Sequence, residues 1–238
     1  MSNTIFQAAT LILPLVFAIV FHEVAHGWVA RLRGDPTADE MNRLSLNPLR
    51  HIDPIGTIVL PGILALVKAP VLGWAKPVPV NKWRLDNPRR DMMLVAAAGP
   101  GTNLLLAAAG AVALGLLVRW FGDQQAPSLL LAFTLANLVN FLLINIFLAL
   151  FNLLPIPPFD GSHIVEGLLP RDMARSYARF RPYGLPLIVM LLIVLPWLVP
   201  GFDIIGGVVL PPAEWLRDHY LALAQWVAGR SFAELGQA

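Results

Sequence analysis

Long apolar runs constrain the fold of this chain more than any other feature of its sequence. Three of them occupy residues 5–30, 91–120 and 128–154, and a shorter run that contains proline occupies 183–199. A helix of about 20 apolar residues crosses the ~30 Å hydrocarbon core of a bilayer. The composition agrees, because 57% of the residues are hydrophobic and only 13% are charged, against about 25% charged in soluble domains. The sequence therefore predicts an all-α polytopic membrane protein with about 4–6 transmembrane helices.

The stretch between the first two runs predicts a different kind of structure. Residues 54–67 are apolar but short, which fits a re-entrant or interfacial segment better than a full crossing. Residues 73–81 contain Pro77 and Pro79, which disfavour helix and suggest an extended edge strand or a hairpin. A plain surface loop is an equally consistent alternative. We expect a small membrane-associated β-hairpin or re-entrant segment near residues 54–85.

The first apolar run carries the motif H-E-x-x-H at residues 22–26. On a helix, His22 and His26 are one turn apart and project from the same face. This spacing suits two nitrogen ligands on one zinc ion, with Glu23 beside them as a general base for water. Chance is the alternative, but the chain has only five histidines, and ionisable side chains in a membrane span require an internal partner or a wet cavity. Because cysteine is absent, any metal must be held by His, Asp or Glu.

Two further polar positions lie at the depth of the predicted spans. The third run ends in N-L-L-P-I-P-P-F-D-G, at residues 152–161, and its prolines break the helix where a lone carboxylate appears. Broken backbone at this depth is tolerated where it is buried or lines a wet cavity, so Asp160 is a candidate third zinc ligand. A solvated aspartate before a glycine turn is the alternative. Asn103, in the second run, either binds substrate or bonds a neighbouring helix.

Charge predicts the orientation in the membrane. If residues 54–67 do not cross, the polar stretches 31–53, 68–90 and 170–182 share one side and hold most of the Lys and Arg residues. The positive-inside rule then places this side and the metal site at the cytoplasmic face, and we expect a bacterial inner-membrane protein. The N-terminus has no positively charged region, so the first run is expected to be retained rather than cleaved. The net charge of +2 and the lack of an arginine-rich face argue against a nucleic-acid partner.

These motifs, in this order, resemble those of the site-2 protease family, the intramembrane zinc metalloproteases. The resemblance rests on H-E-x-x-H at 22–26 and on N-x-x-P-x-P-x-x-D-G at 152–161. The stretch A-G-P-x-x-N at 98–103 resembles the intervening helix of the family, and K-P-V-P-V at 76–80 resembles its β-hairpin. Phe159 stands where the family usually has leucine. The chain resembles a compact form without an inserted PDZ domain or a nucleotide-sensing domain.

The resemblance implies a site, a cofactor and a partner. His22, His26 and Asp160 would bind one Zn²⁺, Glu23 would be the general base, and Asn152 would contact the substrate carbonyl or oxyanion. The substrate would be a transmembrane protein within the lipid bilayer, cleaved in regulated intramembrane proteolysis. Residues 1–238 would form a single membrane-embedded domain, with a catalytic core at about 5–170 and C-terminal helices at 183–230.

Two alternatives stay open from the sequence. A zinc transporter would show ligand sets on several helices or repeats, whereas the sequence contains one cluster. A catalytically inactive binding protein of the same fold would have no need of a base such as Glu23.

Overall fold

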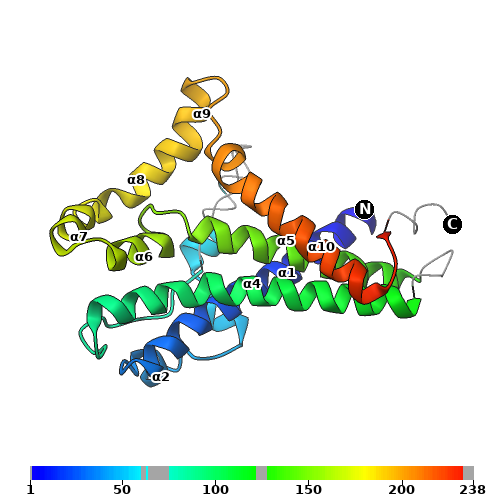
Figure 1. Cartoon of the computed structure of the whole chain (residues 1–238), viewed down its shortest axis with the longest axis horizontal. Helices are drawn as coiled ribbons and strands as arrows, with labels where there is room; N and C mark the ends of the chain where they lie inside the picture. Colours follow the sequence, from blue (N-terminus) through cyan, green and yellow to red (C-terminus); the bar gives the residue numbers. More distant parts are fainter. Residues whose placement is uncertain (1, 60–62, 64–74, 122–127, 233–238) are drawn as a thin grey trace. The chain divides into compact units, whose positions relative to one another are not determined.

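A computed structural model of the chain describes residues 2–59, 63, 75–121 and 128–232, and within these ranges it contains helices and connecting segments but no strand (Figure 1). The elements, with η for 3₁₀ and π helices, are α1 (Ser2–Leu32), α2 (Thr37–Glu40), η1 (Pro48–His51), η2 (Pro54–Val59), α4 (Pro88–Phe121), α5 (Leu129–Asn152), α6 (Asp160–Leu168), α7 (Arg171–Ala178), η3 (Arg181–Tyr183), α8 (Gly184–Val189), η4 (Met190–Val194), α9 (Leu195–Leu198), η5 (Ile205–Val209) and α10 (Leu210–Ala228).

Four helical segments in the described part of the chain are long and apolar enough to cross a membrane. They are Ile5–Leu32, Pro88–Phe121, Leu129–Asn152 and Arg171–Leu198. Pro14 and Pro100 lie inside the first two, as is tolerated in membrane helices. The all-α fold and the expected number of spans are confirmed.

The predicted β-hairpin near residues 54–85 is wrong for the residues that the structure describes. Pro54–Val59 form a π-helical segment, and residues 75–81 form no strand. Pro77 and Pro79 have no N–H group, and the N–H of Val78 donates to Glu23 Oε2 at 2.7 Å rather than to a neighbouring strand. With its donors absent or engaged, this segment cannot form a β-ladder. Whether residues 54–67 cross the membrane depends largely on residues outside the described ranges.

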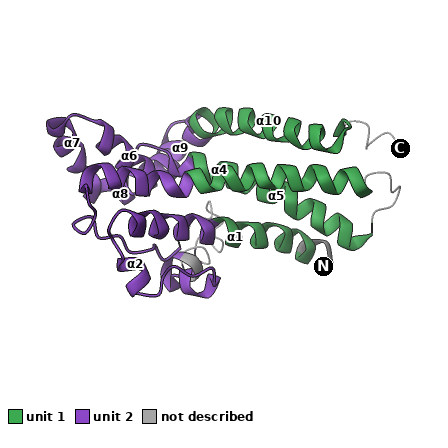
Figure 2. Ribbon diagram, turned by 60° about the horizontal axis from the view of Figure 1, so that its bottom comes forward, with its two compact units in different colours: residues 1–18, 101–150, 206–238 green, residues 19–100, 151–205 purple. Residues whose placement is uncertain are grey.

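The chain divides into two compact units (Figure 2), and α1 and α4 contribute residues to both. Unit 1 comprises residues 1–18, 101–150 and 206–238. Its core is formed by small and branched apolar side chains of α4, α5 and α10: Ala107, Ala111, Leu114, Val118, Leu142, Ile146, Ala224 and Ala228. Tyr220 of α10 adds a hydrogen bond to the Leu104 carbonyl at 3.1 Å. The predicted single domain stays a prediction.

Unit 2 comprises residues 19–100 and 151–205, and it holds both sequence motifs. Its buried apolar cluster joins the end of α1 to the start of α4 through Ala30, Leu85 and Val95. The start of α4 is fixed by reciprocal capping, because Asn87 Oδ1 accepts from the Arg90 N–H and Asp91 Oδ2 accepts from the Asn87 N–H. This cap sets the register of the turns of α4 that face the H-E-x-x-H motif.

Candidate metal centre

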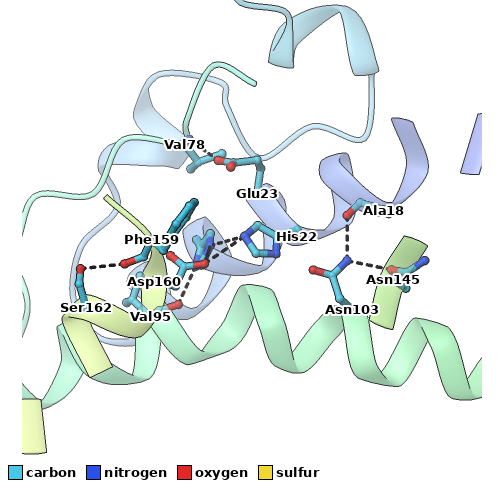
Figure 3. A network of polar contacts seen from close by, with 11 residues as sticks. Ala18, His22, Glu23, Val78, Val95, Asn103, Asn145, Phe159, Asp160 and Ser162 are labelled. Atoms are coloured by element: carbon cyan, nitrogen blue, oxygen red, sulfur yellow. Dashed lines mark hydrogen bonds and ion pairs between the residues drawn. The ribbon is translucent and has the colours of Figure 1, made fainter. Parts of the chain in front are cut away.

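Three side chains predicted as metal ligands meet in unit 2 (Figure 3). His22 and His26 project from one face of α1, with their Nε2 atoms 3.1 Å apart. Asp160 Oδ2 lies 3.1 Å from His22 Nε2 and 3.3 Å from His26 Nε2. The structure therefore brings together residues that are far apart in the sequence, as the motifs predict.

His26 is oriented by a backbone group of α4. Its Nδ1 atom lies 2.7 Å from the Val95 carbonyl oxygen, an acceptor that requires the proton to be on Nδ1. The other ring nitrogen, Nε2, then carries a lone pair and faces His22 and Asp160. A hydrogen bond from the far ring nitrogen is the usual support for a metal-binding histidine.

Asp160 is presented by the break between α5 and α6. Pro155, Pro157 and Pro158 end the long helix, and Asp160 is the first residue of α6. A carboxylate is favoured at this position because the helix dipole is positive there. Ser162 Oγ donates to the Phe159 carbonyl at 2.7 Å, which fixes the turn that carries the carboxylate.

The geometry fits a metal ion. A tetrahedral zinc site with bonds of about 2.0–2.1 Å separates its nitrogen and oxygen ligands by about 3.3 Å, close to the 3.1–3.3 Å sides of this triangle. Asp160 Oδ2 is buried, and the polar atoms that it faces among the described residues are the two imidazole Nε2 atoms. Lone pairs that converge without a proton between them repel unless a cation lies among them, so this donor set suits a divalent metal.

Gly99 of α4 leaves the space that the two imidazole rings occupy. A Cβ atom at this position would lie 2.5 Å from His26 Nε2 and 2.6 Å from His22 Cε1. Sequence reasoning did not connect Gly99 with the two histidines, because its closeness to the rings is a tertiary contact. Gly27 of α1 likewise permits a close approach, since a Cβ there would meet Leu44 and Val78.

Glu23 has its carboxylate directed toward the segment that follows residue 74 (Figure 3). Its Oε2 atom accepts the Val78 N–H at 2.7 Å. This bond fixes the position of the carboxylate. The sequence did not reveal Val78 as a partner, because a backbone N–H leaves no side-chain signal.

The two predicted asparagines occupy different surroundings. Asn152 is the last residue of α5 and partly buried in unit 2, and its contact with a substrate stays a prediction. Asn103 is fully buried in unit 1, where its amide donates to the Ala18 carbonyl at 3.2 Å and to Asn145 Oδ1 at 2.8 Å. These bonds match the helix-bonding alternative, and a substrate-binding role for Asn103 stays a prediction.

Several known proteins are similar to this chain. The model of peptidase family M50 matches residues 121–195. "Putative zinc metalloprotease YwhC" of Bacillus subtilis (strain 168) is 38% identical over 190 residues, which cover 78% of this chain and 80% of that protein. "Putative zinc metalloprotease Rip2" of Mycobacterium tuberculosis (strain H37Rv) is 30% identical over 247 residues, with 94% of this chain and 85% of that protein covered.

A third relative, the protein of the same name from Mycolicibacterium smegmatis, is 31% identical over 179 residues. The alignment covers 75% of this chain and 64% of that protein. No solved structure gives a significant match.

Proposed function

Because this chain belongs to peptidase family M50, the site-2 protease family, we propose that it hydrolyses peptide bonds within or near transmembrane segments of other membrane proteins. The observation that carries this proposal is the cluster that Asp160 forms with His22 and His26, two residues of an apolar, membrane-length helix that also carries Glu23. Three protein ligands, rather than four, are typical of catalytic zinc sites.

Zinc is the cofactor of this family, and His22, His26 and Asp160 would hold it. When bound, zinc supplies Lewis-acid chemistry, which polarises a carbonyl and makes water a nucleophile at neutral pH. The Val95 carbonyl supports the site by keeping the His26 proton on Nδ1.

Glu23 moves the protons of the reaction. Its carboxylate accepts a proton from the attacking water and then delivers it to the nitrogen of the leaving amine. The Val78 N–H donates to Oε2 of this carboxylate. We therefore assign proton transfer to the other oxygen, Oε1, which does not take part in that bond. The same N–H holds the carboxylate in place while its charge changes.

Asn152 is assigned to the substrate carbonyl through its side-chain amide, as a donor to the developing oxyanion. We expect Asn152→Ala to keep its zinc and to lower kcat by about 10²–10³-fold. Zinc content and single-turnover cleavage rates measure the two effects separately. Wild-type turnover in the variant would remove Asn152 from the mechanism.

The position of the site within an apolar helix supports a membrane substrate. Large apolar side chains of α1 point outward, with Phe17 56% exposed and Leu13 47% exposed, as expected for a helix that faces lipid. A bond that reaches such a site must belong to a chain within or beside the bilayer. We assign the protein to the bacterial inner membrane, with the site toward the cytoplasm and a role in regulated intramembrane proteolysis.

The decisive experiment compares the wild type with Glu23→Gln and Asp160→Ala. Each protein is purified in detergent, its zinc is measured by mass spectrometry, and it is given a fluorescent peptide containing one transmembrane helix. We expect Glu23→Gln to bind zinc at wild-type stoichiometry without cleaving, because the base is lost and the ligands are kept. Asp160→Ala should lose both zinc and cleavage.

Other outcomes would point to the alternatives. Zinc binding without cleavage in the wild type, together with zinc uptake into proteoliposomes, would indicate a transporter. Zinc binding without either activity would indicate an inactive binding protein. Cleavage by Glu23→Gln at the wild-type rate would contradict the proposed mechanism.

A further inference from the structure

Unit 2 contains a second concave site, which the metal centre does not use. A cleft of about 560 Å³, open to solvent on one side, is lined by the segment before α4, the first turns of α4, and helices α6 and α7. Its volume lies in the range of small-molecule sites, roughly 300–1,000 Å³. It is therefore larger than a single ion requires.

The cavity is strongly positive. Five cationic side chains line it, and Glu166 is the one carboxylate among its lining residues. The cations are Lys82, Arg89, Arg171, Arg175 and Arg181. Such an excess of one sign in a concavity with low-dielectric walls concentrates the field and attracts ligands of the opposite charge.

The single carboxylate neutralises one of these cations. Glu166 forms an ion pair with Arg181, and the Glu166 carbonyl accepts from Arg89 at 3.4 Å. Burial lowers the pKa of His163, and the Arg181 charge lowers it further. The excess positive charge therefore resides on Lys82, Arg89, Arg171 and Arg175.

The remaining interactions of these cations with protein groups are weak. Arg175 lies 3.6 Å from Asp172, but both side chains are mostly exposed, at 77% and 95%, where ion pairs contribute little. Lys82 stands over the Trp83 ring at 4.8 Å, a contact that leaves its ammonium donors available. Four cations thus face one cavity without a committed anion among the described residues.

We propose that this cavity is a binding site for a phosphate-bearing anion, supplied either by a phospholipid headgroup or by a soluble phosphate compound. Arginine fits this role because its planar guanidinium donates two parallel hydrogen bonds to phosphate oxygens. Arg171 and Arg175 are one turn apart on α7, so both can engage the same group. Trp83 and Met92, which also line the cavity, supply apolar contact for the part of the ligand next to the phosphate.

Binding to purified wild-type protein in dodecyl maltoside tests this proposal. Isothermal titration uses four probes: inorganic pyrophosphate, micelles doped with phosphatidylglycerol, micelles doped with phosphatidylcholine, and a polyglutamate peptide. We expect saturable binding of pyrophosphate, phosphatidylglycerol or both, weakened by added salt. Pyrophosphate alone would identify a soluble ligand, and phosphatidylglycerol alone would identify a lipid.

The double variant Arg171→Gln/Arg175→Gln should weaken the affinity by about tenfold or more for each guanidinium removed. Arg179→Gln is the matched control, because this exposed arginine directly follows the same helix but does not line the cavity. Arg171→Lys/Arg175→Lys should recover part of the affinity, since it restores the charge without the planar fork. Zinc content reports whether each variant is folded.

Three results would overturn the proposal. These are no saturable binding of either phosphate probe, equal affinity in the double variant and Arg179→Gln, or tighter binding of polyglutamate than of both phosphate probes. The last result would indicate a site for an acidic peptide. Because none of these measurements uses cleavage, the outcome is independent of the protease proposal.

Discussion

At the scale of single residues, the metal centre requires glycine at position 99. Gly99 faces both imidazole rings, and a Cβ atom there would approach His26 Nε2 to 2.5 Å. The rings cannot retreat freely, because His26 Nδ1 is bonded to the Val95 carbonyl on the same helix. Because Gly99 has only a hydrogen atom where alanine has a methyl group, the two imidazole rings can keep the positions that bring their Nε2 atoms together.

We expect Gly99→Ala to weaken zinc binding by about 10–100-fold, the range seen when the supporting surroundings of metal ligands are altered. Competition with a chromogenic zinc chelator measures the affinity. Gly101→Ala is the control on the same helix, because a Cβ there meets no atom within 4 Å. It should bind zinc as tightly as the wild type and gain about 0.5–1 kcal/mol of stability. Equal affinities for the two variants would contradict this role for Gly99.

Much of the site could be predicted from single residues. The rest could not be predicted, and the cause is physical. The spacing of His22 and His26 predicts a shared face on any helix, and the prolines before Asp160 mark a break where a carboxylate is exposed to the site. By contrast, the Val95 carbonyl and the Val78 N–H are backbone groups present at every position. Only the packing of α1 against α4 and against residues 75–81 brings the Val95 carbonyl to His26 and the Val78 N–H to Glu23.

At the scale of elements, apolar length predicted the long helices correctly, whereas local propensity failed for the hairpin. The prolines of residues 75–81 do disfavour helix, as expected. The segment then becomes a loop because most of its hydrogen bonds to the described residues are made with side chains, although the Lys76 N–H donates to the His51 carbonyl at 2.8 Å. Arg43 donates to the Lys76 carbonyl at 2.8 Å, and Asp35 Oδ2 accepts the Asn81 N–H at 2.6 Å. Distant partners of this kind leave no periodic signal in the sequence.

The helices of unit 1 are joined by a buried polar contact. Asn103 of α4 donates to Asn145 of α5 and to the Ala18 carbonyl of α1 (Figure 3). We expect a double-mutant cycle of Asn103→Ala and Asn145→Ala to show a coupling of about 0.6–1.7 kcal/mol, the range measured between membrane helices. Reversible unfolding in mixed micelles provides the free energies.

Asn137→Ala supplies the control for that cycle. The Asn137 amide donates to the Phe133 carbonyl of its own helix at 2.8 Å, so Asn103→Ala and Asn137→Ala should be additive. A coupling near zero for Asn103 and Asn145 would show that their hydrogen bond does not hold α4 to α5.

At the scale of the whole molecule, the absence of cysteine makes the proposed orientation directly testable. Single cysteines can be introduced without removing any native thiol. Arg50 and Ser128 are both exposed. Arg50 belongs to the stretch 31–53, which the positive-inside rule places inside, whereas Ser128 begins the third predicted span, on the opposite side of the membrane.

We expect an impermeant maleimide to label Ser128→Cys from the outside of intact spheroplasts. Arg50→Cys should be labelled only in inverted vesicles. Labelling after detergent solubilisation controls for reactivity at both positions. The reverse pattern would place the metal centre on the periplasmic side and contradict the proposed orientation.

The arrangement of the metal ligands also affects how the protein is made. His22 and His26 lie in the first helix, whereas Asp160 follows the third long helix. At about 5–20 residues per second, the ribosome delivers the two histidines on the order of ten seconds before the carboxylate. The nascent chain thus carries an incomplete ligand set while its first spans enter the bilayer. Any activity that requires all three residues therefore begins only once the chain has been synthesised through α6.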